Sequence, residues 1–377
     1  RQTLGILSTE LLAAQNQTME MSLEQVVKIA RLESPDAQTA RHSFRSAYWN
    51  YQYYRANYLP SLSLSSDPNL NRAINKITMG DGSVKFVEQN LLNTDLTLNL
   101  SQNIPWTGGS LFLETSAQRM DLFSEHKYSW QTSPIMIGYR QSLFGYNSLK
   151  WDKRIEPVRY QEAKKSYVET LELVSANAIN KFFALATAQS NYDIASFNYA
   201  NADTLYRYAQ GRYNIGTITE NEMLQLELNR LTEETNRMNA RIEMDNCMQE
   251  LRSYLGIQEE REIRVRVSSR IPDFSINLNE ALALAYENSP DIQTMKRRKL
   301  ESESAVARAR ANAGLKADIY LRFGLTQTAD KLPEAYRNLL DQQYVSLSIS
   351  LPILDWGRGK GQVRVCLLYT SDAADDK

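Results

Sequence analysis

Side chains that could perform catalysis or bind a metal are scarce in this sequence. Neither His42 nor His126 has further ligands at the spacing that a metal site needs. The adjacent Glu233 and Glu234 fall in a charged helical pattern, which is typical of a solvated helix face rather than of acid–base catalysis. The stretch 357–361, Gly-Arg-Gly-Lys-Gly, lacks the Gly-Lys-Ser/Thr order of a phosphate loop. The sequence therefore predicts no catalytic residue, no metal site and no cofactor, and the protein is not expected to be an enzyme.

Composition narrows the choice of partners. The chain has 43 basic and 44 acidic residues, so it lacks the basic surface that nucleic-acid binding requires, and nucleic acid is not an expected partner. Its two cysteines support no disulfide framework. No apolar run reaches the roughly 18 residues that a membrane-spanning helix needs, whereas spanning strands, which alternate in polarity, remain compatible with the low mean hydropathy.

An internal repeat organises the chain. Residues 34–39, Ser-Pro-Asp-Ala-Gln-Thr, return as residues 289–294, Ser-Pro-Asp-Ile-Gln-Thr, at an offset of 255. Leu23 and Leu278 precede the two prolines by the same distance, and Arg-Ala-Asn follows both copies at 55–57 and 310–312. A repeat of this length predicts two similar halves that build one object around a pseudo-symmetric axis.

Each copy begins with a helical pattern and continues with alternating strands. In the first copy we expect a helix at 23–58, broken and capped again at 34–36, and strands within 61–145. The second copy predicts a helix at 278–313 and strands at 318–324 and 345–351. The first copy has about 45 more residues in its strand region, which form either an additional hairpin or a long loop.

A heptad pattern fills the middle of the chain. Leu185, Tyr192, Tyr199 and Tyr206 recur every seven residues, and alanines follow three residues after each, which predicts a coiled-coil seam of large knobs and small holes. The helix is expected to begin near Pro157 and to be ~80 Å long at ~1.5 Å per residue. The chain should turn at 211–216 and return, giving a long helical hairpin at 150–255.

The order of these elements resembles that of the TolC-like outer-membrane efflux proteins. The resemblance rests on the strand-ending segments 143–147 and 351–357 and on the helix-turn segment 212–222, Arg-Tyr-Asn-Ile-Gly-Thr-Ile-Thr-Glu-Asn-Glu, and it covers about residues 22–365. It implies a mixed α/β membrane protein: a transmembrane β-barrel shared by three chains and continued by an antiparallel coiled-coil α-barrel, with an internal structural duplication. Four to six strands are too few to close a barrel alone, so several chains are needed.

The repeat and the resemblance together predict the domain organisation. We expect a signal remnant or leader at 1–21, a first repeat at 22–256, a connecting segment at 257–276 and a second repeat at 277–365. The family continues after the second strand corner into another helical hairpin, so the resemblance implies that the second repeat is truncated. Residues 366–377 break the pattern abruptly and are predicted to be a non-native tail.

The resemblance also implies a function and its partners. The chain would be a passive conduit in the outer membrane, contacting its lipid and extending into the periplasm as helices, and exporting material as one component of a tripartite system with an inner-membrane pump. The helical tip would dock a periplasmic adaptor, and the matching residues are Arg212, Tyr213, Ile215, Gly216 and Thr217. Alternatively, the two glycines at 211 and 216 only end and turn helices.

Four tryptophans are candidates for an aromatic belt at the membrane interface: Trp106, Trp130, Trp151 and Trp356. All four are expected at strand ends or turns, although core packing would also explain them. Asp355, at the second strand corner, is expected to cap the following helix, the alternative being that it faces the lumen of the barrel. The main alternative function is a soluble or peripheral coiled-coil scaffold, and porin-like uptake is disfavoured because it would leave the long helices without a role.

Overall fold

The computed structural model describes most of the chain as two units. The described residues are 19–80, 82–123, 125–259, 261–268 and 275–375. The helical unit comprises the described parts of Arg1–Ser46 and Ala163–Pro290, and the sheet unit comprises those of Ala47–Glu162 and Asp291–Lys377.

Two helix pairs carry the repeated sequence. The pairs are α2 (Leu23–Glu33) with α3 (Pro35–Ala56), and α6 (Leu278–Asn288) with α7 (Pro290–Ala313). In both copies a serine ends the first helix by donating its backbone N–H to the carbonyl of Ala30 or Ala285. The next helix starts at proline, which fits a first helical position because it lacks the N–H that would have no partner there. The predicted break is therefore confirmed, although α3 ends two residues before the predicted boundary.

The two copies differ in packing. Val26 and Ala30 of α2 are fully buried, whereas no residue of α6 is buried, including Ala281 and Ala285 at the repeated positions. The core of the helical unit lies among α2, α4 (Ser148–Asn214) and α5 (Glu220–Leu255). Its buried apolar residues are Met21, Val26, Ala30, Ala37, Val174, Ala178, Phe182, Leu185, Ala188, Met244, Leu251, Leu255 and Ile263.

A small parallel sheet lies in segments that were predicted to be a leader and a connector. Strand β1 (Met19–Ser22) pairs with β7 (Ile263–Arg266), and Met21 and Ile263 are both buried in the core. The final residues of the predicted leader are therefore part of the folded helical unit, because the Met21 side chain packs into its core. Residues 1–18 of that leader lie outside the described residues.

Helix α4 is longer than predicted. It has 67 residues and begins at Ser148, where the Asn147 side-chain oxygen accepts the Lys150 backbone N–H at 3.0 Å. Pro157 therefore lies inside the helix, and its predicted place in the first turn is wrong because the cap lies at Asn147 instead. Gly211 also lies inside α4, so it does not end the helix. At ~1.5 Å per residue α4 is ~100 Å long.

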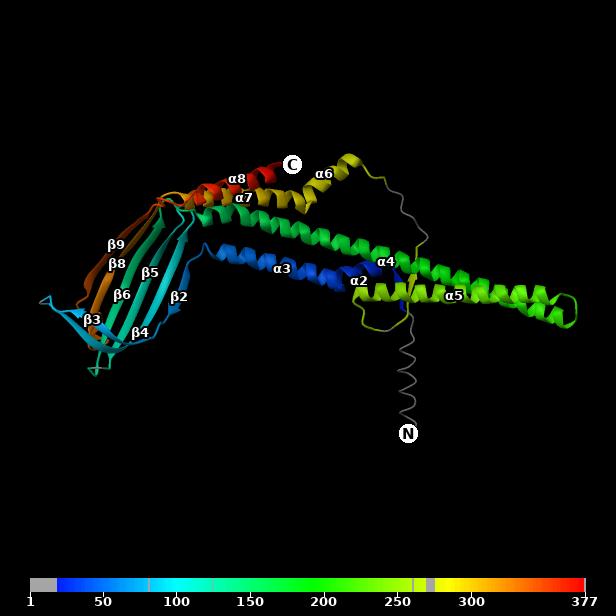
Figure 1. Ribbon diagram of the computed structural model, residues 1–377, viewed down its shortest axis with the longest axis horizontal. Coiled ribbons are helices and arrows are strands. Elements are labelled where there is room, and N and C mark those ends of the chain that lie inside the picture. Colours follow the sequence, from blue (N-terminus) through cyan, green and yellow to red (C-terminus); the bar gives the residue numbers. More distant parts are fainter. Residues whose placement is uncertain (1–18, 81, 124, 260, 269–274, 376–377) are drawn as a thin grey trace, which may run out of the picture. The chain divides into compact units, whose positions relative to one another are not determined.

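The strands of the sheet unit form one antiparallel sheet (Figure 1). Its order is β2-β4-β5-β6-β8-β9, and β3 pairs with β4 beyond the end of β2. The additional residues of the first copy therefore form strands. The strands are β2 (Ser61–Ser65), β3 (Asn69–Thr78), β4 (Val84–Ile104), β5 (Gly109–Leu122), β6 (Lys127–Ser142), β8 (Lys316–Ala329) and β9 (Leu340–Ser350), with a 3-10 turn, η1 (Glu334–Tyr336), before β9.

A helix follows the second strand corner. α8 (Arg358–Asp375) begins beside Asp355, whose carboxylate accepts the backbone N–H groups of Gly357 and Gly359 at 2.9 and 2.8 Å. Asp355 thus caps the helix, as expected, and these bonds lower the pKa of its carboxyl. α8 continues without a break through Cys366, which packs against α7, so the non-native origin of residues 366–377 stays a prediction.

None of the described helices combines the length and the apolarity that crossing a bilayer requires.

Candidate functional site

The sheet carries an apolar face that is continuous across six strands. Successive residues of a strand point to opposite faces, so residues paired across strands share a face. Leu100 of β4 pairs with Leu62 of β2 and with Leu113 of β5, and the same row continues through Ile137 of β6 to Phe323 of β8. The exposed large members of this apolar face are Leu62, Leu64, Leu96, Leu98, Leu100, Leu111, Leu113, Ile135, Ile137, Phe323, Val345, Leu347 and Ile349.

An exposed apolar patch of this extent is unusual on a surface that contacts water, and it indicates contact with lipid or protein. The length of strand β6 gives the height of this apolar face. From Trp130 to Tyr139 it advances ~30 Å at ~3.3 Å per residue. A tilt of ~40° reduces this to ~23 Å, close to the ~25 Å apolar band of membrane barrels.

The opposite face of the sheet is polar. Ser63 of β2 pairs with Asn99 of β4, which pairs with Glu114 of β5, and these residues alternate with those of the apolar face. The polar face contains Ser61, Ser63, Ser65, Thr97, Asn99, Ser101, Glu114, Ser116, Arg140, Asp318, Arg322, Ser346, Ser348 and Ser350. Such a two-faced sheet can separate an apolar phase on one side from water on the other.

An aromatic and ionic cluster stabilises the polar face. Arg322 donates to Glu114 at 2.9 Å, joining β8 to β5 across the intervening β6. Between them, Gly138 leaves space for the Phe112 ring, since a Cβ there would lie 2.0 Å from it. Phe112 consequently stacks on Tyr320 with centroids 5.9 Å apart. A glycine in the middle of a strand is explained here by the close approach of a side chain.

The four candidate belt tryptophans occupy three kinds of position. Trp106, in the β4–β5 turn, is 85% exposed, and Trp356, after β9, is 90% exposed. Trp130 lies near the start of β6 and is covered by the Arg119 guanidinium, 5.7 Å from the ring centroid. Trp151 lies in the first turn of α4, so the expectation that all four lie at strand ends or turns is wrong for it, because the helix starts at Ser148.

The predicted adaptor-binding residues form the end of α4 and the turn that follows. Gly216 has a φ of +72°, and its N–H donates to the Tyr213 carbonyl at 2.9 Å, while Thr217 N–H donates to the Arg212 carbonyl at 3.0 Å. This pair of bonds is a Schellman ending, in which glycine takes the left-handed position. Ile215 is 74% exposed at the apex. The tip therefore holds an apolar side chain in water on a rigid turn.

The start of α5 makes the turn rigid from the other side. Thr219 accepts the Glu222 backbone N–H, and the Glu222 carboxylate accepts the Thr219 backbone N–H at 2.8 Å, which is a capping box. The bonds from Thr219 lower the pKa of Glu222. The carboxylate is also favourable near the positive end of the helix dipole.

The seam residues of α4 contact arginines of α5. Leu185 is buried, and the three seam tyrosines lie beneath guanidinium groups. Arg241 stacks over Tyr192 at 5.5 Å, Arg237 over Tyr199 at 4.1 Å, and Arg230 over Tyr206 at 5.4 Å. These three contacts are called the Tyr–Arg ladder below. The heptad pattern of tyrosines and alanines did not indicate these arginines, although their spacing of seven and four residues on the returning helix was a usable signal.

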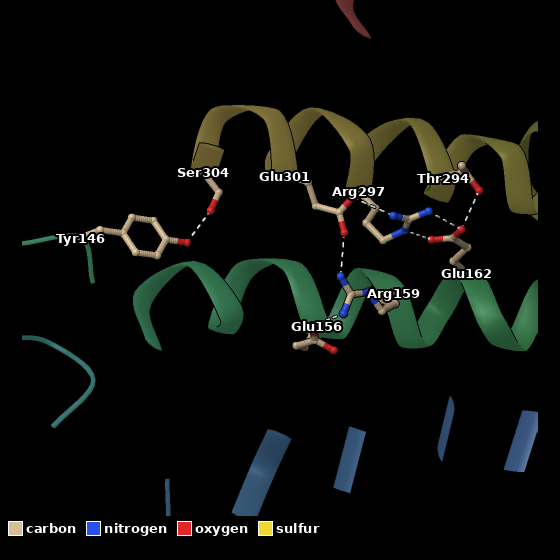
Figure 2. A network of polar contacts seen from close by, with 8 residues as sticks. All are labelled: Tyr146, Glu156, Arg159, Glu162, Thr294, Arg297, Glu301 and Ser304. Carbon is tan, nitrogen blue, oxygen red and sulfur yellow. Dashed lines mark hydrogen bonds and ion pairs between the residues drawn. The ribbon is translucent and has the colours of Figure 1, made fainter. Parts of the chain in front are cut away.

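In the sheet unit a polar network joins the start of α4 to α7 (Figure 2). Arg297 of α7 donates to both carboxylate oxygens of Glu162, at 2.5 and 3.0 Å, and Thr294 donates to Glu162 at 2.9 Å. Arg297 also donates to Glu301, which accepts a further bond from Arg159 at 2.6 Å. Such bidentate arginine–carboxylate pairs fix geometry as well as adding energy.

The carboxyl groups at this junction differ in pKa. Burial alone would raise the pKa of Glu162, but the bonds from Arg297 and Thr294 outweigh it and lower the pKa. Burial raises the pKa of Glu156 and of Asp152, whose neighbouring arginines only partly offset it. Of Glu162, Glu156 and Asp152, only Glu162 therefore has a lowered pKa.

Among the residues that the structure describes, no group of three or more His, Cys, Asp or Glu side chains could hold a metal ion. The organised features are instead a two-faced sheet, a capped helical tip and polar contacts between long helices.

Comparisons with solved structures identify the class of this fold. The chain superimposes on the CmeC outer membrane channel of Campylobacter jejuni with a TM-score of 0.66 at 16% identity, covering 94% of this chain and 66% of that one. For the outer membrane protein VceC of Vibrio cholerae the TM-score is 0.62 at 14% identity, covering 94% and 74%. For the open state of the MtrE outer membrane channel of Neisseria gonorrhoeae it is 0.54 at 14% identity, covering 93% and 68%.

The chain has the fold of these outer-membrane channels, which confirms, at the level of fold, the predicted resemblance to TolC-like proteins. It spans slightly less than two thirds of the CmeC chain. No protein-family model matches the sequence, and no curated protein matches it either.

Proposed function

We propose that this chain is part of the wall of an outer-membrane channel, a passive conduit from the periplasm to the exterior in a tripartite export system. The observation that carries the proposal is the register-matched separation of an apolar and a polar face across six strands. In a closed barrel the apolar face would contact lipid and the polar face would contact water.

The proposed assembly is a homotrimer in which three sheets join into one barrel. Six strands on the path of the described sheet are fewer than the about eight that the smallest membrane barrels use, so one chain is not sufficient. The long helices would extend into the periplasm. A porin needs no helices below the membrane, so porin-like uptake would leave these long helices without a role.

A conductance experiment tests the channel. The protein purified in detergent should migrate as a heat-resistant trimer and should produce ion conductance in planar lipid bilayers. The alternative, a soluble or peripheral scaffold, predicts extraction into buffer without detergent and no conductance. A monomer that is stable in plain buffer would refute the proposal.

We further propose that the tip residues Arg212, Tyr213, Ile215, Gly216 and Thr217 dock a periplasmic adaptor that couples the channel to an inner-membrane pump. The support is the presentation of Ile215 in water on a turn that is fixed by the Schellman bonds and by the capping box of α5. An exposed apolar side chain on a rigid turn suits contact with another helical tip, because little conformational entropy is lost on binding.

Ile215→Asp tests the docking without changing the left-handed residue beside it. Burying the exposed part of an isoleucine stabilises a complex by about 1–2 kcal/mol, so we expect roughly tenfold weaker docking. Export would be measured as tolerance of a channel-deleted host to a panel of toxic compounds. Asn214→Asp is the matched control, since it adds the same charge one residue earlier and keeps the apolar side chain.

Ile215→Asp should lose export while retaining trimer and conductance, and Asn214→Asp should retain all three. Normal export by Ile215→Asp would refute docking at this tip. Gly216 is unsuitable for this test because its positive φ strains any other side chain, so a loss of export there would not separate docking from folding.

A further inference from the structure

The two repeats contribute different numbers of strands to the sheet. Within the described residues, two strands on the path, β8 and β9, lie between α7 and α8, whereas four, β2, β4, β5 and β6, lie between α3 and α4. β2 follows α3 as β8 follows α7, and β6 leads into α4 as β9 leads into α8. The hairpin β4–β5 is therefore the insertion that distinguishes the first repeat.

The inserted hairpin is paired along its length with the rest of the sheet. Leu91 to Ile104 of β4 pair without interruption with Leu122 to Gly109 of β5, and β5 pairs in turn with β6. It contributes to both faces, with Leu113 on the apolar one and Glu114 on the polar one. The bond from Arg322 to Glu114 ties it to the second repeat.

The turn of the hairpin is also fixed to its neighbours. The Asn147 side chain donates to the Pro105 carbonyl at 3.0 Å, and the Gln141 side chain donates to the Thr107 carbonyl at 2.8 Å. Gly108 has a φ of +77°, and a Cβ on it would lie 2.8 Å from Asn147. A surface loop that folded away from the sheet would not need these contacts, so the hairpin is a constituent of the wall.

The two edges of the sheet suit each other. In the described part of the chain β2 pairs only with β4 on the path, and β9 pairs only with β8. All neighbouring strands on the path are antiparallel and their number is even, so the two edge strands run in opposite directions. The edge β9 of one copy can then pair in antiparallel fashion with β2 of the next, and the apolar face continues across the joint from Leu347 to Leu64.

We propose that the β4–β5 hairpin widens the pore, so that three copies of this chain close a barrel of eighteen strands, three times the six on the path of one sheet. Two strands per repeat would give twelve. The inference rests on the proposed trimeric channel. Barrel diameter grows roughly linearly with strand number, so the barrel would be about 1.5 times as wide and its cross-section about twice as large. The barrel would then admit bulkier solutes than a twelve-stranded one.

Two measurements on the detergent-solubilised protein, the mass of the assembly and the number of strands in its barrel, test this inference separately from the proposed channel function. Native mass spectrometry gives the number of chains, and a density map of the same preparation gives the number of strands. Three chains with eighteen strands support the inference. Three chains with twelve strands, with the hairpin outside the wall, overturn it and leave the channel proposal intact. Any other number of chains overturns the proposed trimer instead.

Disulfide formation tests the joint between copies. Ser63→Cys of β2 would be combined in one chain with Ser346→Cys, Ser348→Cys or Ser350→Cys, which lie on the polar face and sample three registers of the joint. At least one combination should yield chains linked up to the trimer in a non-reducing gel. Ser63→Cys with Leu347→Cys is the matched control and should not link, since Leu347 lies on the opposite face. A trimer in which no polar-face pair links would contradict the β9–β2 joint.

Discussion

Leu347 and Ser348 are adjacent on β9 and lie on opposite faces of the sheet, which makes them a matched pair for testing whether the apolar face contacts lipid. Leu347 pairs with Ile319 on the apolar face, and Ser348 pairs with Asp318 on the polar face. Arginine at either position adds the same charge and places the same side chain on the sheet. Only the surroundings differ.

The expected cost of Leu347→Arg follows from its depth. It lies three residues before Ser350 at the end of β9, or ~10 Å along the strand and ~8 Å along the membrane normal after tilt. Arginine on the lipid face of a barrel costs about 2–4 kcal/mol at the midplane and less toward the interfaces. We therefore expect about 2 kcal/mol per chain, which is about 30-fold in the folding equilibrium. In water the cost would be near zero, because Leu347 is already 58% exposed.

Ser348→Arg should cost much less, since it faces the wet side and lies opposite Asp318, a carboxylate of complementary charge. It should instead shift the ion selectivity of the channel toward anions. The assay is urea titration of protein folded into lipid vesicles, with the folded fraction followed by gel mobility without boiling. Equal unfolding free energies for the two variants, or a larger loss for Ser348→Arg, would refute the assignment of the faces.

Two further predictions concern the helices. Arg297→Met leaves the half-buried Glu162 without its bidentate partner and should destabilise the α4–α7 junction by about 1.5–3 kcal/mol in thermal unfolding followed by circular dichroism. Because the folded-state pKa of Glu162 is lowered, its contribution is present above the ordinary carboxyl pKa of about 4.3 and is lost as pH falls through the folded value, so the difference from wild type should shrink in acid. Arg237→Ala should remove one rung of the Tyr–Arg ladder and cost about 0.5–1 kcal/mol, and a double-mutant cycle with Tyr199→Leu should recover that amount as coupling.

Both helix predictions have controls in the chain. Arg207 of α4 is 76% exposed at its side chain and pairs with Asp203, so Arg207→Ala should change stability by only a few tenths of a kcal/mol. A difference between wild type and Arg297→Met that stays constant from neutral pH to below pH 4 would contradict ionised Glu162 as its source. A coupling free energy of zero between Arg237 and Tyr199 would show that the two side chains lie close together without stabilising the helical hairpin.

Local structure was largely predictable from the sequence because it depends on neighbouring residues. The Ser-Pro-Asp segment ends one helix and starts another in both copies, since the proline cannot continue the first helix and suits the start of the second. Gly216 and the Thr219 cap likewise determine where the helical hairpin turns. Alternation in polarity predicted the strands for a similar reason, and the order of these elements was enough to indicate the fold.

The arrangement of distant residues required the tertiary structure. The pairing of β4 with β5 and of β6 with β8 decides which leucines share a face, and it shows that the additional residues of the first repeat join the sheet as strands. The repeat did not predict that α2 would be buried while α6 is exposed, because burial depends on which helices pack alongside. The Arg297–Glu162 pair joins residues 135 positions apart, and no sequence period relates them. Caps and alternation are encoded within a few residues, whereas the faces of the sheet and the partners of each helix are decided only when segments far apart in the chain come together.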